Sequence, residues 1–458
     1  MSTKRQNNQL ELAFMTWNRS EALKDVTEGT EVPGKDRGTE SPAITEQLME
    51  EVVERENCKA ALKQVKANKG GPGIDGMTVD ELPEHLVEHW PAIREELLNG
   101  TYKPQPVKRV EIPKPDGGVR KLGIPTVLDR FIQQAVMQVL QRKWDRTFSE
   151  HSYGFRPGRS THQAVSQAQQ YIAEGYRRVV DLDLEKFFDR VNHDKLMGQV
   201  AKRITDWRMR KLIRALLNAG VMESGLVSPT VEGTPQGGPL SPLLSNLVLD
   251  ELDQELERRG HRFVRYADDS NIYVRSERAG KRVMESIVRF ITIRLKLKVN
   301  SEKSAVAKPQ ERKFLGFSFT RHAEPKRRIA PKAVERFQER VREITSRTRG
   351  VSFEEVVKEL TVYLRGWRGY FGFCQTPSVL KGLEEWVRRR LRSYLWKQWR
   401  TGHQRFVELR KRDVGLDLAA QTAASSHGPW RLSASPALSV AFPNAYFDSL
   451  GLPRLAVG

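Results

Sequence analysis

The chain has 458 residues, enough to bury a large core and to divide into roughly two to four domains. Its formal net charge is +20, so a polyanion is the first partner to consider and an anionic lipid surface is the alternative. No run of 18 or more apolar residues could span a bilayer, no apolar signal segment follows the start, and two cysteines exclude a cysteine-based zinc module. We therefore expect a cytoplasmic protein without a membrane segment.

Periodicity and turn residues predict the elements of the first half of the chain. Residues 1–45 are polar and mixed, and we expect a short helix and then a flexible linker there. In chain order the predicted elements are helices over 8–25, 43–67, 82–99 and 129–147, a glycine-rich loop over 68–76, and a basic hairpin of strands 107–113 and 119–124 around the turn 114–118.

The second half alternates between apolar strands and longer helices. From about residue 330 the sequence becomes helical and strongly basic. The predicted elements are strands over 177–184, 262–265, 271–274, 297–300 and 312–319, and helices over 241–259, 276–296 and 383–400.

Two neighbouring acids, Asp268 and Asp269, lie between the strands 262–265 and 271–274. Adjacent strand residues point to opposite faces, so two acids serve one site only where a turn breaks the alternation. Like charges at that spacing repel unless a cation lies between them, and Mg²⁺ is the natural candidate. The alternative is a solvated turn with two acids.

A third acid, Asp183, ends the apolar strand over 177–184, and Asp181 shares its face. An acid at the end of a buried strand is unfavourable unless it is paired or metal-bound. Asp183 could therefore complete a two-metal site with Asp268 and Asp269. The alternative is that Asp183 caps a helix.

The acids and five further motifs, taken together in order, resemble the palm of reverse transcriptases. More closely, residues from about 50 to 458 resemble a bacterial group II intron-encoded reverse transcriptase/maturase of the kind that lacks a C-terminal endonuclease domain. The motifs that carry the resemblance are at 73–76, 112–125, 152–157, 234–242 and 314–317.

The resemblance implies an α+β fold, a right-hand polymerase with fingers, a palm that holds an antiparallel sheet, and a helical thumb. It divides the chain into a variable N-terminal extension and linker (1–45), fingers and palm (46–325), thumb or maturase domain X (326–410), and a C-terminal tail that binds DNA or RNA (411–458). The two cysteines leave no endonuclease module, so we expect priming from a nick or a pre-existing DNA end.

The resemblance also implies roles for single residues. Asp183, Asp268 and Asp269 would hold two Mg²⁺ ions, with Mn²⁺ as a substitute, and Asp181 would lie outside the metal shell. Phe188 would exclude a ribose 2′-OH, whereas its neighbour Phe187 is better explained as a core residue. Lys303 would lie near the leaving pyrophosphate, although a surface lysine is the alternative.

Chemistry suggests further contacts to substrate. Lys114 and Arg120 flank the hairpin turn and suit a triphosphate, as a point charge and a bidentate fork; the alternative is two solvated side chains. Gln236 lies in a glycine-rich loop that lets the backbone approach a nucleotide or template. Arg156 and Arg159 are explained equally well as template contacts and as structural salt bridges.

The helix over 383–400 carries an apolar stripe and an excess of arginine over acid. A core helix with a solvated charged side explains the stripe, and phosphate contacts explain the excess of charge. Arg388, Arg389 and Arg392 are accordingly predicted to bind template or intron RNA.

The sequence thus predicts an RNA-directed DNA polymerase that uses dNTPs, an RNA template with a DNA primer, and target DNA. As a maturase it would also bind its group II intron RNA, assist splicing and target-primed retrohoming, and act as a cytoplasmic ribonucleoprotein. Two alternatives stay open: an RNA-binding splicing cofactor without polymerase activity, and a domesticated reverse transcriptase that serves defence or repair.

Overall fold

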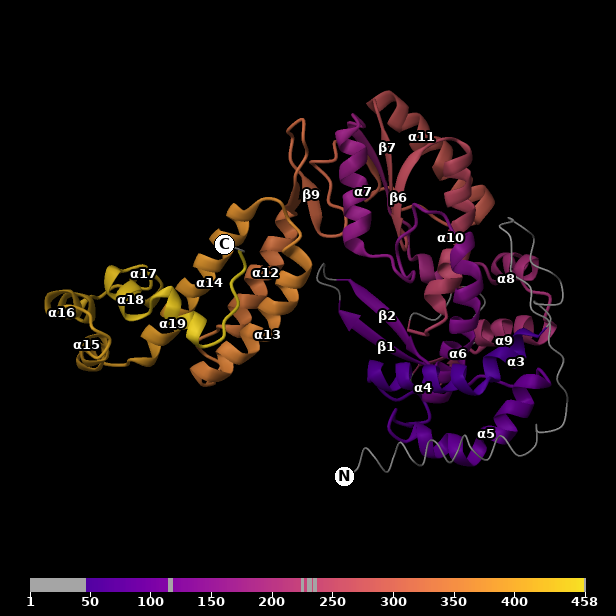
Figure 1. Ribbon diagram of the computed structural model, residues 1–458, viewed down its shortest axis with the longest axis horizontal. Coiled ribbons are helices and arrows are strands. Elements are labelled where there is room, and N and C mark those ends of the chain that lie inside the picture. Colours follow the sequence, from indigo (N-terminus) through magenta and orange to yellow (C-terminus); the bar gives the residue numbers. More distant parts are fainter. Residues whose placement is uncertain (1–46, 114–117, 224–225, 229–232, 234–236, 457–458) are drawn as a thin grey trace, which may run out of the picture. The chain divides into compact units, whose positions relative to one another are not determined.

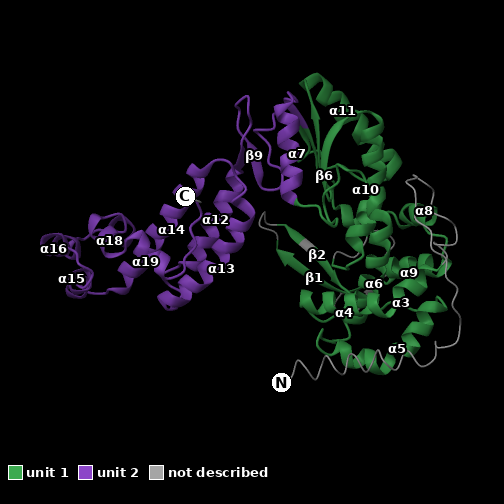
Figure 2. Ribbon diagram, viewed as in Figure 1, with its two compact units in different colours: residues 1–160, 180–306 green, residues 161–179, 307–458 purple. Residues whose placement is uncertain are grey.

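The computed structural model describes residues 47–113, 118–223, 226–228, 233 and 237–456, and Figure 1 gives the element labels. The chain forms two compact units, shown in Figure 2: residues 1–160 with 180–306 make unit 1, and residues 161–179 with 307–458 make unit 2. The predicted helix over 8–25 and the linker after it lie outside the described residues.

Three helices open unit 1. The predicted helix over 43–67 is two helices, because Glu54 adopts an extended conformation with φ −60° and ψ 141°. The glycine-rich stretch that follows is a loop, as expected, and the next helix contains Pro91. These helices are α3 (Leu48–Val53), α4 (Arg55–Asn68) and α5 (Leu82–Leu98).

The basic hairpin forms one side of a four-stranded sheet with the order β2-β1-β4-β5. Its two strands are antiparallel, with Lys108 opposite Ile124 and Pro113 opposite Val119, while β4 runs parallel to β1. The turn residues 114–117 lie outside the described parts of the chain. The strands are β1 (Val107–Pro113), β2 (Val119–Ile124), β4 (Val221–Glu223) and β5 (Leu226–Ser228); the sequence pattern missed the last two.

Buried helices connect the two sheets of unit 1. Thr126 caps α6 by accepting from the Asp129 N–H, and Asp206 caps α9 in the same way through Arg208 and Met209. α10 is buried over much of its length and packs against β6 and α8. These helices are α6 (Val127–Trp144), α8 (His193–Arg203), α9 (Trp207–Asn218), α10 (Ser241–Arg258) and α11 (Glu277–Phe290), with short turns at η2 (Asp145–Thr147), η3 (Phe187–Asp189) and η4 (Ile291–Leu295).

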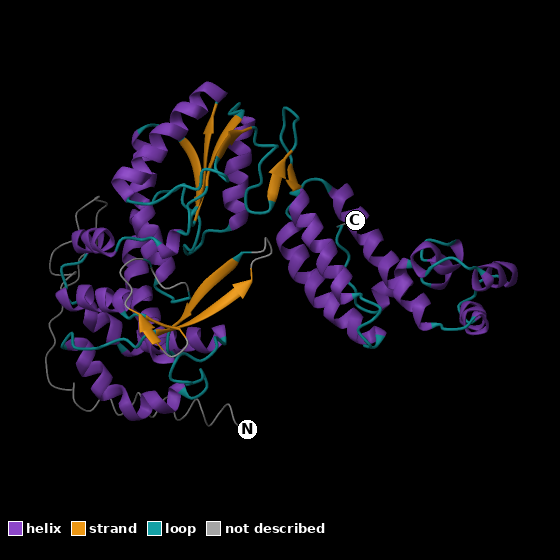
Figure 3. Ribbon diagram, turned by 180° about the vertical axis from the view of Figure 1, so that it is seen from behind, coloured by secondary structure: helices purple, strands orange, loops and turns teal. Residues whose placement is uncertain are grey.

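The second sheet of unit 1 has the order β6-β7-β3-β8 (Figure 3). β6 and β7 form an antiparallel hairpin with Tyr266 opposite Asp269. Only Ala267 and Asp268 are therefore left in the turn, which is tighter than the sequence pattern suggested. The strands are β3 (Arg178–Leu182), β6 (Arg262–Tyr266), β7 (Asp269–Val274) and β8 (Ala305–Ala307).

Two predicted strands near the end of unit 1 are shorter or displaced. Over 297–300 only Val299 pairs, through an isolated bridge to Leu184, and the edge of the sheet is formed by β8 instead. The predicted strand over 312–319 is reduced to β9 (Phe317–Phe319), which pairs with β10 (Arg327–Ile329) in unit 2.

Unit 2 is mostly helical, as the basic C-terminal sequence predicted. It also includes α7 (Thr161–Ala173), which comes much earlier in the chain; the His162 ring hydrogen-bonds the Tyr370 carbonyl oxygen at 2.8 Å. No helix in the described residues of either unit is long and apolar enough to cross a membrane. The remaining helices are α12 (Pro331–Ile344), α13 (Phe353–Phe371), α14 (Pro377–Gln398), α15 (Gly402–Arg410), α16 (Leu416–Ala424), α17 (Pro429–Leu432), α18 (Pro436–Ala441) and α19 (Asn444–Ser449).

Candidate active site

The β6–β7 hairpin places two acids in and beside its turn. Ala267 has φ +56°, a left-handed conformation that residues with a side chain seldom adopt and that two-residue hairpin turns of the II′ type have at their first central residue. Asp268 follows in the turn and is half-buried, while Asp269 begins β7 and is exposed. The turn thus interrupts the strand alternation at Asp268 and Asp269, as two neighbouring acids that serve one site require.

Asp183 follows directly after β3, which is the neighbour of β7 in the sheet. Its backbone is fixed on both sides: the Asp183 N–H donates to Ser304 Oγ at 3.0 Å, and the Asn300 N–H donates to the Asp183 carbonyl oxygen at 2.8 Å. The side chain is half-buried. The residue is therefore held at a defined position at the end of its strand.

One contact between the strands links the regions that contain these acids. With the Asn271 amide oriented to satisfy both of its ends, its nitrogen donates to Asp181 Oδ1 at 3.0 Å. Asp183 lies two residues beyond this contact on β3, and Asp269 lies two residues before it on β7. Asp181 is thus engaged by a neighbouring strand.

The described residues contain no group of three or more His, Cys, Asp or Glu side chains arranged to hold a metal ion. Asp183, Asp268 and Asp269 therefore form no closed cage by themselves. Mg²⁺ in nucleotide-dependent enzymes is held by one or two carboxylates together with substrate phosphates and water. Three carboxylates that are half-buried or exposed, on neighbouring strands, fit a site of that open kind.

The loop over 152–157 packs against the back of the turn. A Cβ atom on Gly154 would lie 2.3 Å from the Ala267 nitrogen, so only glycine fits at this position. The ring centroid of Phe155 lies 6.3 Å from that of Tyr266. This motif therefore supports the acidic hairpin directly.

The two arginines of that motif are paired inside unit 1. Arg156 is buried, with its Nε 2.8 Å from Asp145 Oδ1 and a further bond to the Ser152 carbonyl oxygen. Arg159 pairs with Glu150 and stacks on Tyr153. Both arginines thus form the structural salt bridges that the sequence left open, and their template contacts stay predictions.

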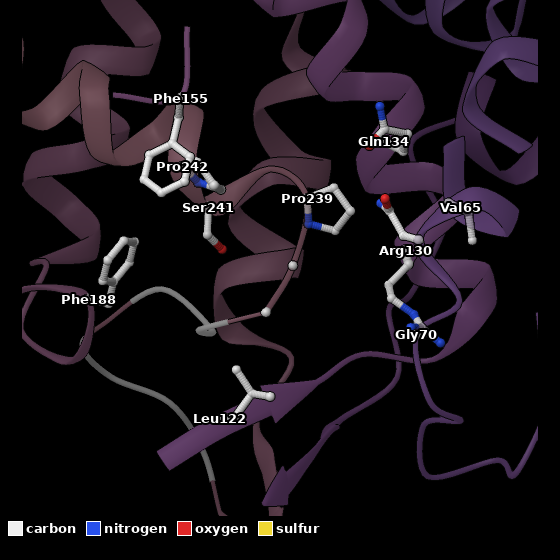
Figure 4. A pocket seen from close by; sticks show the side chains of 13 residues that line it. Val65, Gly70, Leu122, Arg130, Gln134, Phe155, Phe188, Pro239, Ser241 and Pro242 are labelled. Carbon is white, nitrogen blue, oxygen red and sulfur yellow. The ribbon is translucent and has the colours of Figure 1, made fainter. Parts of the chain in front are cut away.

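A pocket of about 480 Å³ opens beside this loop and is shown in Figure 4. Phe155 and Phe188 lie on one side of it and Arg130 on the other, while Leu122 projects from β2. Phe188 is half-buried at the pocket wall, whereas Phe187 is buried in the core, as the sequence suggested.

The glycine-rich loop that lines the pocket passes very close to the basic hairpin. Gly237 has φ +132°, and a Cβ atom there would lie 2.6 Å from the Gly123 carbonyl oxygen. The next residue, Gly238, faces the Gln133 side chain so closely that a Cβ atom would lie 2.2 Å from Oε1. Gly237 is thus required by its backbone conformation and by close approach to backbone, whereas at Gly238 the flexible end of the Gln133 side chain can shift.

The other predicted nucleotide contacts are only partly placed. Lys114 and Gln236 lie outside the described residues. Arg120 is in β2, with its backbone opposite Ile112. Lys303 is exposed in the turn just before Ser304, the residue that accepts from the Asp183 N–H.

Arg130 and Gln134 line the pocket and were missed by sequence reasoning. Arg130 Nη2 donates to the Gly71 carbonyl oxygen at 2.7 Å, and burial lowers the pKa of its guanidinium. Both residues lie on α6, one turn apart, among buried apolar side chains. Polar residues at core positions of an amphipathic helix were the signal that would have found them.

The arginines of α14 face the C-terminal segment. Arg388 is 3% exposed and pairs with Glu384 and with Asp448 at 3.0 Å, and Arg392 Nε donates to the Phe442 carbonyl oxygen at 3.0 Å. Arg389 stacks on Trp430 at 4.1 Å. The charge of Arg388 is thus paired inside unit 2, and its contact with nucleic acid stays a prediction.

Comparison with known protein families gives two matches in the predicted order. Residues 112–319 match the family model for reverse transcriptase (RNA-dependent DNA polymerase), and residues 334–412 match the maturase-specific domain of group II introns. The chain therefore carries a reverse transcriptase region followed by a region that matches the maturase domain of group II introns. The resemblance inferred from the motifs and the expected α+β polymerase fold are confirmed, and the dependence on a divalent cation is a general property of reverse transcriptases.

Relatives agree with this assignment. Protein YkfC of Escherichia coli is 39% identical over 220 residues, which are 47% of this chain and 58% of that protein. Group II intron-encoded protein LtrA of Lactococcus lactis is 31% identical over 325 residues, 56% of this chain and 54% of that protein. Retron Mx65 reverse transcriptase of Myxococcus xanthus is 30% identical over 208 residues, 43% and 46% respectively. The chain spans about half the length of these relatives.

Proposed function

We propose that this reverse transcriptase/maturase is an active RNA-directed DNA polymerase that extends a DNA primer on an RNA template with dNTPs. The observation that carries the proposal is the two-residue turn that holds Asp268 and begins β7 at Asp269, on a strand beside the one that ends at Asp183. If β3 runs antiparallel to β7, the Asp181–Asn271 contact sets Asp183 opposite Asp269.

The reaction joins the primer 3′-OH to the α-phosphate of a dNTP and releases pyrophosphate. Asp183, Asp268 and Asp269 would hold two Mg²⁺ ions, for which Mn²⁺ can substitute; bound there, the cations supply charge neutralisation and activation of the attacking oxygen. The protein's own contribution is positioning, as is general in phosphoryl transfer.

Other side chains would select and orient the nucleotide. Phe188 at the pocket wall would exclude a 2′-OH by contact with the sugar. Lys114, Arg120 and Lys303 would neutralise the triphosphate and the leaving pyrophosphate. Gln236, next to the closely packed Gly237, would hydrogen-bond the nucleotide or template.

We further propose that the maturase domain binds the group II intron RNA and stabilises its splicing-competent fold, with target DNA as a second partner. Because Arg388 is neutralised internally, the contacts would come instead from exposed cations on α12 and α13. Four of these are Lys332, Arg336, Lys358 and Arg365, which are exposed in the structure. Cations of this kind bind phosphates by releasing counterions.

A primer-extension assay with wild type and Asp268→Ala, run beside a splicing assay on intron RNA, tests both proposals. We expect the wild type to extend the primer, the variant to lose extension because the turn carboxylate is gone, and both proteins to support splicing. If wild type and variant are equally inactive in extension while splicing survives, the protein is an RNA-binding splicing cofactor and the polymerase proposal fails.

A further inference from the structure

A fully buried arginine lies directly behind the acidic turn. Arg265 is in β6, two residues before Ala267, and its side chain is 0% exposed. Its partner Asp253 on α10 is equally buried; Arg265 Nε donates to Asp253 Oδ1 at 2.8 Å and Nη2 donates to Oδ2 at 2.6 Å. This ion pair fastens β6 to the helix beneath the sheet.

The remaining donors of the guanidinium reach in other directions. Nη1 donates to Asn246 Oδ1 and to the Ala267 carbonyl oxygen, each at 2.9 Å, and Nη2 donates to Ser152 Oγ at 2.7 Å. A guanidinium has five N–H donors in a rigid plane, and here that plane is used in full. One side chain therefore connects the helix, the loop over 152–157 and the turn itself.

The neighbours of Arg265 are tied to each other as well. Asn246 Nδ2 donates to the Gly154 carbonyl oxygen at 2.8 Å, and Gly154 is the residue packed against the Ala267 nitrogen. Ala267 is thus held from two sides, by a hydrogen bond on its carbonyl oxygen and by close packing on its nitrogen. Such contacts keep a non-glycine residue in the left-handed conformation that the turn needs.

We propose that Arg265 is a positioning residue for nucleotidyl transfer: through Ala267 it fixes the turn that presents the carboxylates of Asp268 and Asp269. The inference rests on the proposed polymerase function. Stability alone does not explain a buried ion pair here, because replacing both partners by well-packed apolar side chains is often neutral or stabilising. Only the planar guanidinium, with its several N–H donors, also provides the hydrogen bond to the turn.

Two substitutions separate positioning from stability. Arg265→Lys keeps a cation beside Asp253, but a compact ammonium cannot reach Asn246, Ser152 and Ala267 together. Asn246→Ala keeps the Arg265–Asp253 pair and removes one hydrogen-bond partner of Arg265. This variant provides the test if Arg265→Lys does not fold.

The same helix offers a matched control one turn earlier. Asp250 is also a buried carboxylate of α10, and Arg203 Nη2 donates to its Oδ2 at 2.8 Å. Arg203 comes from α8, and among the described residues the hydrogen bonds of this pair go to Thr147 and Gln254 rather than to the turn. Asp250→Asn therefore perturbs a buried pair that makes no hydrogen bond to the turn.

The experiment measures kcat and KM for dNTP on primed RNA, and Mn²⁺ affinity by electron paramagnetic resonance on the full chain with dNTP and a 3′-deoxy primer. We expect Arg265→Lys and Asn246→Ala to lower kcat about tenfold or more and to weaken Mn²⁺ binding about tenfold, with little change in KM. Asp250→Asn should leave both close to wild type at equal folded fraction.

The proposal is overturned if Arg265→Lys and Asn246→Ala lower kcat no more than Asp250→Asn does, or if their Mn²⁺ affinity equals that of wild type. Should the wild type fail to extend any primer, the proposed polymerase function fails, and Mn²⁺ affinity alone then decides the role of Arg265. A wild type that neither extends primers nor binds Mn²⁺ overturns both.

Discussion

Asp250 and Asp253 lie one helical turn apart on α10, and their different surroundings show what the sequence could not reveal. Asp253 is paired through both oxygens with Arg265, whereas Asp250 Oδ1 has no hydrogen-bond partner among the described residues. Motif order pointed to Asp183, Asp268 and Asp269, because the pair lies in a turn between two strands and Asp183 ends an apolar strand, both of which the local sequence shows. Arg265 was not found, because its burial depends on Asp253, a partner on another element that strand periodicity cannot register.

Asp250 gives a prediction for pH dependence. Burial raises the pKa of its carboxyl from 3.8 to about 6, even though Arg203 acts in the opposite direction. Since the folded protein holds this proton more tightly than the unfolded chain, the group's stabilisation is complete below pH 3.8 and is lost as the pH rises through 6.

Asp250→Asn should therefore remove a pH-dependent component of stability. In urea titrations, the stability of wild type relative to the variant should fall between pH 4 and pH 7, by at most roughly 3 kcal/mol. Parallel stability curves for the two proteins across this range would show that Asp250 is ionised at all of these pH values.

Among the elements, long segments with strong local signals were predicted well, and short ones that depend on distant partners were not. The basic hairpin and α10 followed from alternation and periodicity. The three-residue strands β4, β5 and β8 carry too little pattern and exist because a neighbouring strand pairs with them. No glycine or proline in the sequence indicates the helix break at Glu54. The sequence pattern did not show the ion pair between Arg388 and Asp448, because the two residues are far apart in the sequence.

The ion pairs of Arg388 lead to a prediction for α14. Arg388→Ala leaves the half-buried Glu384 without its cation, whereas Asp448 keeps Arg454, so unit 2 should lose about 3 kcal/mol of stability. Intron RNA affinity per folded molecule should stay unchanged. Arg336→Ala, at an exposed position of α12, is the matched control and should do the reverse, with stability kept and affinity reduced. Thermal unfolding and filter binding check the pair; a loss of affinity confined to Arg388→Ala would reverse the assignment.

At the scale of the whole molecule, the net charge of +20 sets how the protein meets RNA. Composition alone predicted a polyanionic partner, and that inference needed no structure. The division into units did need one: the two family domains are continuous in sequence, whereas unit 2 includes α7 from the middle of the reverse transcriptase match. The domain boundaries drawn from the sequence remain predictions. They describe functional regions of the chain rather than its compact units.

The charge predicts a steep salt dependence. If the RNA complex involves about six phosphate contacts, affinity should fall about a thousandfold between 50 and 200 mM salt. Binding isotherms over this range give the slope, and Arg336→Ala should reduce it by about one contact. A salt-independent affinity would mean that stacking and hydrogen bonds, rather than phosphates, dominate the interface.

The placement of α7 in unit 2 also limits how the protein can be divided into fragments. The chain passes from one unit to the other at residues 160–161, 179–180 and 306–307, so neither unit is a single continuous stretch. A fragment that begins at residue 307 lacks the helix whose His162 meets Tyr370, and one that ends at 306 keeps that helix without its partner. A cut at any one of these junctions would therefore divide at least one of the two units.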